Sequence, residues 1–549
     1  MRIGPIAALF VLAIVETAAA QTQPLLQLQG QPYFGGSMTL HLSGAVGQPA
    51  LVAYGLNPLT TPLQTGKGSW YIGGLVNLVA VGSIPMGGRI DLAFTMPPLM
   101  PVLAGIPIVM QGYVPWQLSN PAIVSLDMPY FEPTAATVIA SPNPSVGAAF
   151  GDRFAAGDLN DDGNVDLVVG SWFEDVQLID EAGRVYVLWG PSFQTSAALQ
   201  SPNPANIAGF GASVLIADLN KNGVDDLLIG EIVSDPPTPP DTGTIYVYMD
   251  ATSLSSPSFA IQSPTTGLDA APFGRHVVVG DFNGDDWPDV AAGIAYATVA
   301  GFAKAGMIAI YWGPNFSTHA EIVSPTLGAG DFFGSDIAVG DVNGDGIDDL
   351  VEASSRDVVG GQLNVGSVHV FIGPTLSIFT TIHNPVPTLG SSFGAYVLGV
   401  DLNDDGMDEV VTSDERNKVY VYWAPGLQTH DEIAKPPSTY VNPFGEKSFG
   451  AFLGDADVNE DGHPDLVIGD PFEKGTGRIY LGLGPHRSTF HVIADKIEPD
   501  GGLFGRSAVV VDLDGDGQPE LVSGDSTADE AGLSNSGHVT VYDLEIPGS

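Results

Sequence analysis

From about residue 134 onward, the chain repeats one alternation of polar loops and short apolar segments. In the first unit, the apolar segments cover residues 166–170, 183–190 and 198–202, with glycine or proline between them. Their β-branched and aromatic content predicts strands rather than helices. With the segment that precedes the first loop, each unit of roughly 60 residues provides four antiparallel strands, which is one blade of a β-propeller. Seven units predict an all-β, seven-bladed propeller over residues 134–549.

The two ends of the repeat region complement each other. The seventh unit reaches the segment Gly-His-Val-Thr-Val-Tyr at residues 537–542 and has no fourth strand after it. A spare segment, Ala-Thr-Val-Ile-Ala-Ser-Pro at residues 136–142, precedes the first unit. We therefore expect this N-terminal strand to complete the last blade, so that neither open edge stays exposed.

Two short motifs mark every unit. The first is a Phe-Gly pair, whose phenylalanines are Phe150, Phe210, Phe273, Phe333, Phe393, Phe449 and Phe504. Eight residues later begins a loop of the form Asp-x-Asn-x-Asp-Gly-x-x-Asp or a close variant, starting at Asp158, Asp218, Asp281, Asp341, Asp401, Asp457 and Asp512. The spacing of 55 to 63 residues between loops identifies a repeat architecture.

The loops offer oxygen ligands at positions 1, 3, 5 and 9, a glycine at position 6 for the turn, and a backbone carbonyl at position 7. Calcium takes six to eight such oxygens in irregular geometry, whereas magnesium demands a tighter octahedron. The chain has no cysteine and only His463 lies in a loop, which argues against zinc or copper. The candidate metal ligands are Asp158, Asn160, Asp162, Asp166, Asp218, Asn220, Asn222, Asp226, Asp281, Asn283, Asp285, Asp289, Asp341, Asn343, Asp345, Asp349, Asp401, Asn403, Asp405, Glu409, Asp457, Asn459, Asp461, Asp465, Asp512, Asp514, Asp516 and Glu520.

Two other interpretations of the loops are weaker. An EF-hand needs glutamate at position 12 between two helices, and only the fourth copy has one, Glu352, between strands. Solvated Asp/Asn turns would explain a single loop, but seven loops in register favour up to seven calcium sites. We expect the second loop to bind weakest, because Asn222 replaces an aspartate and Lys221 lies beside it. The third loop has Asp286 at the glycine position, and aspartate tolerates a left-handed backbone better than most residues.

The charge of the chain agrees with this interpretation. The 549 residues include 63 acidic and 18 basic ones, so the formal net charge is −45. The seven loops contain 28 of these acids and a single base, Lys221. Carboxylates crowded in this way raise one another's pKa unless a cation neutralises them. So acidic a surface also excludes general nucleic-acid binding. We expect calcium to act mainly on stability.

At these motifs the chain resembles the FG-GAP repeats of integrin α-subunit propellers and their bacterial secreted relatives. The resemblance covers about residues 134–545. It implies a seven-bladed propeller with calcium-binding hairpin loops, and ligand binding on the face opposite those loops. It does not imply one activity, because propellers of this kind serve adhesion, recognition and occasionally catalysis.

The first 133 residues lack the repeat. Residues 1–20 are interpreted as a signal peptide, with Arg2, an apolar core at residues 6–15 and cleavage near Ala20. The mature chain would then be secreted, extracellular or periplasmic, with no transmembrane segment. Residues 21–133 contain apolar runs at 38–42, 51–54, 90–94, 106–110 and 122–126, which predict a small β-sandwich-like accessory domain that ends near residues 132–134.

No catalytic constellation is recognisable. The sequence Gly-Ser-Ser-Phe-Gly at residues 390–394 matches a serine-hydrolase pattern but begins a repeat unit, where no strand–turn–helix is expected. The leading hypothesis is an extracellular binding or adhesion module for a protein or glycan; the alternatives are an enzyme acting on polysaccharide or lipid through the same face, and a passive surface or matrix component. Candidate ligand-binding residues on the loops of that face are Trp172, Phe173, Tyr296, Phe302, Arg356 and Phe472, with Tyr440 and Phe444 in a long connection beside them.

Overall fold

The computed structural model describes the backbone of ten strands between residues 26 and 125, and most of the chain from residue 136 to residue 544. In this second part the described ranges are 136–232, 242–251, 254–264, 272–414, 416–436, 448–473, 477–484, 490–494, 503–529 and 532–544. The expected signal peptide, the domain junction, Tyr440 and Phe444 lie outside the described residues. The chain divides into two compact units, residues 1–130 with 436–439, and residues 131–435 with 440–549.

The first unit is built from antiparallel strands. One three-stranded sheet has the order β1 (Leu26–Gly30), β2 (Ser37–Ser43), β7 (Arg89–Thr95). A second sheet has the order β10 (Ala122–Ser125), β8 (Pro107–Val114), β3 (Pro49–Gly55), β6 (Asn77–Ser83), with β9 (Gln117–Leu118) beside β8. A hairpin joins β4 (Asn57–Thr65) to β5 (Gly68–Gly73). Each predicted apolar run overlaps one of these strands, and the sandwich-like arrangement of the domain stays a prediction.

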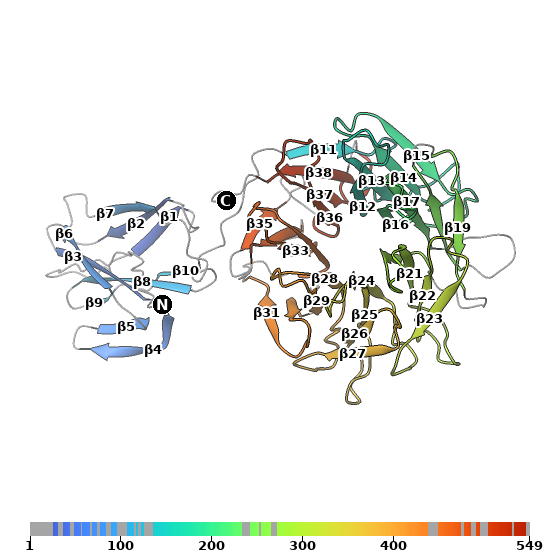
Figure 1. Ribbon diagram of the computed structural model, residues 1–549. Helices are drawn as coiled ribbons and strands as arrows, with labels where there is room; N and C mark the ends of the chain where they lie inside the picture. The colour runs from blue at the N-terminus through green and yellow to red at the C-terminus, as the bar shows by residue number, and fades with distance from the viewer. Residues whose placement is uncertain are drawn as a thin grey trace. The chain divides into compact units, whose positions relative to one another are not determined.

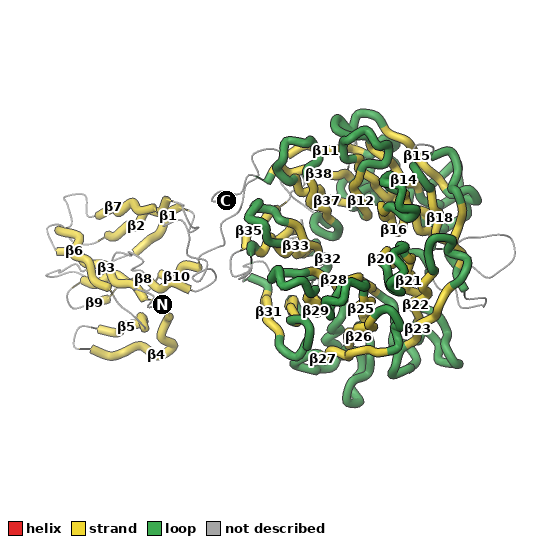
Figure 2. Tube along the Cα trace, in the orientation of Figure 1, coloured by secondary structure: helices red, strands yellow, loops and turns green. Residues whose placement is uncertain are grey.

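The second unit is a seven-bladed propeller of four-stranded antiparallel sheets (Figures 1 and 2). The first strand of each blade lies nearest the axis: β12 (Arg153–Gly157), β16 (Phe210–Ala217), β20 (His276–Gly280), β24 (Asp336–Gly340), β28 (Val397–Val400), β32 (Phe452–Ala456) and β36 (Ala508–Val511). The second strands are β13 (Asp166–Ser171), β17 (Asp226–Glu231), β21 (Asp289–Ile294), β25 (Asp349–Ser354), β29 (Glu409–Asp414), β33 (Asp465–Asp470) and β37 (Glu520–Asp525).

The outer half of each blade completes the pattern. The third strands are β14 (Arg184–Leu188), β18 (Thr244–Tyr248), β22 (Met307–Tyr311), β26 (Ser367–Ile372), β30 (Lys418–Tyr422), β34 (Arg478–Gly482) and β38 (His538–Asp543). The fourth strands of the first six blades are β15 (Ser196–Gln200), β19 (Phe259–Gln262), β23 (His319–Val323), β27 (Ile378–His383), β31 (His430–Ala434) and β35 (Phe490–Ala494).

The seventh blade takes its outer strand from the other end of the propeller. Strand β11 (Ala136–Ala140) pairs antiparallel with β38, and Val138 lies opposite Thr540. The sheet order β11-β38-β37-β36 confirms the predicted closure by an N-terminal strand. Closure hides the edge that β38 would otherwise present to other chains.

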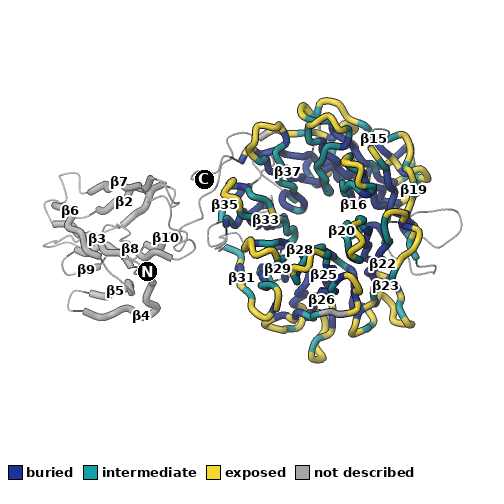
Figure 3. Tube along the Cα trace, viewed as in Figure 1, coloured by how far each residue is buried: buried dark blue, intermediate teal, exposed yellow. Residues whose placement is uncertain are grey.

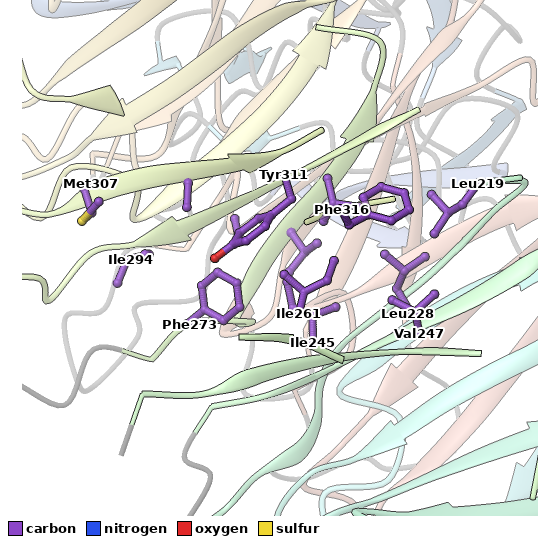
Figure 4. Packing of buried hydrophobic residues seen from close by; sticks show 14 of the residues in the cluster. Leu219, Leu228, Ile245, Val247, Ile261, Phe273, Ile294, Met307, Tyr311 and Phe316 are labelled. Atoms are coloured by element: carbon purple, nitrogen blue, oxygen red, sulfur yellow. The ribbon is translucent and has the colours of Figure 1, made fainter. Parts of the chain in front are cut away.

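The core lies in apolar layers between neighbouring blades (Figure 3). The seven phenylalanines of the Phe-Gly pairs are at most 1% exposed. In six blades this ring packs against the tyrosine of the third strand, with centroids 5.2 to 6.0 Å apart. Figure 4 shows one such layer, in which Phe273 and Tyr311 of the third blade pack near Ile245 and Ile261 of the second. Burial of this kind is the main stabilising contribution to the ring.

Paired glycines set how closely the blades approach. Gly524, near the end of β37 in the seventh blade, faces Gly151 of the first, and a Cβ on Gly524 would lie 1.9 Å from the carbonyl oxygen of Gly151. Gly230 faces Gly274 in the same way, at 1.8 Å. Only glycine allows two backbones to pass so closely, which explains the glycine near the end of the second strand in five blades and the glycine that follows each phenylalanine; the fourth and fifth blades have Ala353 and Ser413 at the strand position.

Candidate functional site

All seven Asp loops connect the first strand of a blade to its second strand, so they share one face of the propeller, called here the loop face. Position 9 of each loop is also the first residue of the second strand, from Asp166 in β13 to Glu520 in β37. The last carboxylate of every loop is therefore fixed by the sheet, while the earlier positions extend toward solvent.

The position-1 carboxylate shapes the turn. In the first loop, the N–H of Asp162 donates to Asp158 Oδ1 at 3.1 Å, and the N–H of Gly163 donates to Asp158 Oδ2 at 2.7 Å. The equivalent bonds from position 6 recur in the other six loops. Position 6 has a left-handed backbone throughout, with φ of 84° at Gly163 and 69° at Asp286. The expectation that Asp286 adopts the glycine conformation is confirmed.

The position-9 carboxylate is buried in every loop. Asp166 is 0% exposed, and its oxygens accept hydrogen bonds from the N–H of Leu159 at 3.1 Å and from the N–H of Gly190 at 2.9 Å. Gly190 follows the third strand, so one side chain joins three parts of the blade. The same pair of bonds recurs around Asp289 and Asp349.

These carboxylates are costly to ionise without a cation. Burial, with repulsion from the other loop carboxylates, raises the pKa of Asp289, Asp349 and Asp465 to about 6, although backbone hydrogen bonds act in the opposite direction. The same causes raise the pKa of Glu409 and Glu520 to about 7. A bound cation would remove this penalty, because it favours the charged form.

The donor set fits calcium. In the seventh loop Asp512, Asp514 and Glu520 place oxygens within 4.8 Å of one another. In the first loop Asn160 Oδ1 is buried and has no hydrogen-bond partner among the described residues. A hard cation bound by side-chain and carbonyl oxygens would satisfy both arrangements.

The second loop is built differently. The side-chain amides of Asn220 and Asn222 both donate to Asp250 Oδ1, which lies after the third strand of that blade. Lys221 Nζ donates to the carbonyl oxygen of Asp286 in the next loop. Two amide groups of this loop thus donate to a carboxylate outside the predicted ligand set, and Asp218 and Asp226 are the charged candidate ligands of this loop. Weakest calcium binding at this loop stays a prediction.

Position 8 of the loops was not predicted from the sequence to have a role. It is an aspartate in three copies, Asp225, Asp348 and Asp408, and in each case it contacts the loop of the preceding blade. Asp348 Oδ2 accepts the N–H of Asp281 at 2.7 Å, and Asp408 Oδ2 accepts the N–H of Asp341 at 2.7 Å. Asp225 accepts from the backbone of Asp158. The recurrence at position 8 was a signal, but its partner lies in another repeat.

The opposite face is formed by the connections between second and third strands and by those between blades. Trp172 was predicted to be an exposed ligand contact, but it is only 8% exposed. Its Nε1–H donates to Asp152 at 2.8 Å, and Phe173 packs on it with ring centroids 3.9 Å apart. The buried polar partner draws the indole under its own loop. Phe472 is half-buried, whereas Phe173 and Phe302 are 36% and 43% exposed.

Tyr296 and Arg356 are brought together on this face by Phe332. The Tyr296 and Phe332 rings meet edge to face at 5.0 Å, and the Arg356 guanidinium lies 4.6 Å from the Phe332 centroid. They line one cavity of about 330 Å³. Ser392, the serine of the hydrolase-like pattern, is buried in the turn before β28, and a strand rather than a helix follows it.

Comparison with known proteins agrees with this architecture. The FG-GAP repeat model matches residues 150–188, 210–248, 273–311 and 333–371, and an FG-GAP-like repeat model matches residues 457–523. The chain contains FG-GAP repeats. Its matched repeats are those whose Phe-Gly pairs and Asp loops form the first four blades and parts of the sixth and seventh.

The curated relatives are similar to this FG-GAP propeller over part of their length. Mouse integrin alpha-8 is 27% identical over 232 residues, which is 39% of this chain and 21% of the integrin. Chicken integrin alpha-V is 28% identical over 228 residues, 38% of this chain and 21% of the integrin. Bovine phosphatidylinositol-glycan-specific phospholipase D is 28% identical over 205 residues, 34% of this chain and 24% of the enzyme. The chain thus spans about a fifth to a quarter of these relatives.

Among solved structures, BBS1N in complex with ARL6DN overlaps 76% of this chain and 98% of its own, at a TM-score of 0.44 and 12% identity, which is a weak likeness. Within the part of the FG-GAP chain that the structure describes, no helix is long and apolar enough to cross a membrane. The bacterial character of the resemblance stays a prediction.

Proposed function

We propose that this FG-GAP protein is a secreted, calcium-stabilised propeller that serves as an extracellular binding module. The observation that carries the calcium part is the recurring buried carboxylate at position 9, which a bound cation would stabilise in its charged form. The likeness to integrin alpha subunits supports the binding part, and the expected signal peptide supports secretion.

The role proposed for calcium is structural. Each ion would be held by the loop that joins the first two strands, and its position-9 ligand also accepts a hydrogen bond from the turn after the third strand. Binding would therefore stabilise three of the four strands of a blade together. At about 1 mM calcium and a Kd of about 0.1 mM, each site would contribute roughly 1.4 kcal/mol to the free energy of unfolding.

The binding role is assigned to the opposite face. The loop face repeats almost the same residues seven times, whereas the opposite face differs from blade to blade and exposes Phe173, Tyr296 and Phe302. Exposed aromatic side chains beside charged ones are typical of contacts that contribute most to affinity. The propeller would thus place its metals on one face and its ligand on the other.

A thermal melt of the full chain with calcium, magnesium or a chelator, together with the metal content, tests the calcium part. We expect calcium to raise Tm by on the order of 10 °C over the chelated protein, because several sites contribute together, and magnesium to raise it much less. A Tm that does not respond to the chelator, with no bound metal, would show that the loops are only turns.

A further inference from the structure

The opposite face gathers basic side chains in a strongly acidic chain. Three of its 18 lysines and arginines stand at the N-terminal ends of inner strands: Arg153 begins β12, Arg275 precedes β20 and Arg506 precedes β36. They come from the first, third and seventh blades. Inner strands surround the propeller axis, so these ends converge, and Arg153 and Arg506 both act electrostatically on Arg275. We call these residues the arginine cluster.

One buried carboxylate compensates part of this charge. Asp152 is 3% exposed, and its oxygens lie 3.2 Å from Arg153 Nη1 and 3.1 Å from Arg506 Nε. Burial acts to raise the pKa of Asp152, but the two guanidinium groups, together with hydrogen bonds from Trp172 and Ser526, outweigh it and lower the pKa. A second carboxylate, Asp336 at the start of β24, lies 3.1 Å from Nδ1 of His276, which lines the same cavity as Arg275. Three guanidinium groups facing two carboxylates still leave the cluster with excess positive charge.

Arg275 is the member without a close acidic partner. It forms no ion pair or hydrogen bond with another described residue, and its guanidinium lies 5.6 Å from the Trp172 ring centroid. Burial lowers its pKa, and repulsion from Arg153 and Arg506 adds to this effect. A half-buried guanidinium has five N–H donors in a planar fork that matches a carboxylate. An oxyanion placed here would both accept those donors and relieve the repulsion.

The cavity next to Arg275 adds an aromatic wall. Arg275 lines the cavity of about 330 Å³ together with Tyr296, Phe332, Arg356 and Tyr396. Tyr296 and Tyr396 are 40% and 39% exposed. The volume lies at the lower end of the range of small-molecule sites. A ligand that carries a negative group beside a flat, partly apolar ring face would match both walls.

We propose that this cavity binds an acidic saccharide, with the sugar carboxylate on Arg275 and the sugar ring against Tyr296 or Tyr396. Aromatic rings present an apolar face to the C–H face of a sugar, and Ser335 and Ser355, which also line the cavity, can bond its hydroxyl groups. This assignment deepens the binding role proposed above for the opposite face, and it does not depend on the calcium loops.

The test is a calorimetric titration of the full chain, in calcium, with glucuronate, glucose and inorganic sulfate. We expect glucuronate to bind with a Kd on the order of 1 mM, as befits a ligand of few atoms, and glucose and sulfate to bind at least tenfold more weakly. Arg275→Gln should weaken glucuronate binding about tenfold. The matched control is Arg416→Gln, which removes an arginine from the same face outside the cavity.

Arg153 and Arg506 are avoided as variants because they neutralise the buried Asp152. If Arg275→Gln does not fold, Arg356→Gln at the exposed rim replaces it, with a smaller expected loss of about threefold. Absence of glucuronate binding, or an Arg275→Gln protein that binds like the parent, would overturn the proposal. Sulfate binding as tight as that of glucuronate would overturn its saccharide part. If the melting temperature depends on calcium but glucuronate does not bind, the proposed role of calcium stands and the saccharide site is rejected. If glucuronate binds but the melting temperature does not depend on calcium, the saccharide site stands and the role of calcium is rejected.

Discussion

The loop face and the opposite face are built from the two ends of the same seven inner strands, yet they differ in kind. In the first blade Arg153 begins β12 and Asp158 follows its end. The Asp158 end repeats in every blade with nearly identical hydrogen bonds, whereas the position of Arg153 holds serine, histidine, aspartate, tyrosine or phenylalanine in the other blades, and Arg275 and Arg506 stand one position earlier in their repeats. Features that every blade needs for stability recur in all seven blades. Features that would serve a single ligand instead arise where residues that differ between blades lie close together. This contrast supports the proposal that metals bind on one face and a ligand on the other.

The largest expected effect comes from a change that separates the blades and so damages both faces together. In Gly524→Val the new Cβ would lie 1.9 Å from the carbonyl oxygen of Gly151, and backbone cannot move aside cheaply. We expect the free energy of unfolding, measured by denaturant unfolding, to fall by about 3 kcal/mol or more. Calcium binding and glucuronate binding should be lost in parallel. Gly426→Val is the control, because nothing lies within 4 Å of a Cβ there. Loss of calcium binding alone, or of glucuronate binding alone, would mean that the two faces do not depend on one closed ring.

Acidification should separate the faces. Without calcium, the folded-state pKa of about 6 at Asp289 and about 7 at Glu409 exceeds the ordinary values of 3.8 and 4.5. The folded state therefore binds protons first, and chelated protein should gain stability as pH falls from about 7.5 to about 5.5. Calcium needs the ionised carboxylates, so its apparent affinity should fall about fourfold at a site of pKa 6 and about 25-fold at one of pKa 7.

Thermal melts across this pH range, with and without calcium, test the direction of both effects. The calcium-induced rise in Tm should shrink as pH falls, while glucuronate binding should not weaken, because arginine stays charged. A calcium effect on Tm that grows on acidification would contradict the assignment of these carboxylates as ligands.

What could be predicted from the sequence differs between the same two faces. The Phe-Gly pairs and Asp loops repeat in register, so blade number, loop position and closure by residues 136–140 were predictable. The arginine cluster was not, since Arg153, Arg275 and Arg506 become neighbours only when the ring forms. Nor was the burial of Trp172, which depends on its hydrogen bond to Asp152.

A smaller effect should come from restoring the repeat in the second loop. Asn222→Asp replaces an amide that donates to Asp250 with a carboxylate that can ligate a cation. Because calcium affinity follows the number of charged ligands, we expect this loop to gain about tenfold in affinity, seen as one more ion retained at limiting calcium by metal analysis. Asn315→Asp, an exposed site in the turn after β22, controls for charge alone. An equal gain in both variants would show only a general electrostatic effect.

The smallest expected effect tests whether neighbouring loops act on each other. Asp348 belongs to the fourth loop but accepts the N–H of Asp281, the first ligand of the third loop. Asp348→Ala should weaken cation binding at the third loop about threefold, the consequence of one lost hydrogen bond, while Asp348→Asn keeps an acceptor and should lose less. Trp287, at position 7 of the third loop, can sensitise terbium luminescence there, and Trp287→Phe identifies its share of the signal. If Asp348→Ala leaves the terbium affinity of the third loop unchanged, the third and fourth loops are independent sites. If the affinity falls, the position-8 aspartates couple the pairs of loops that they join.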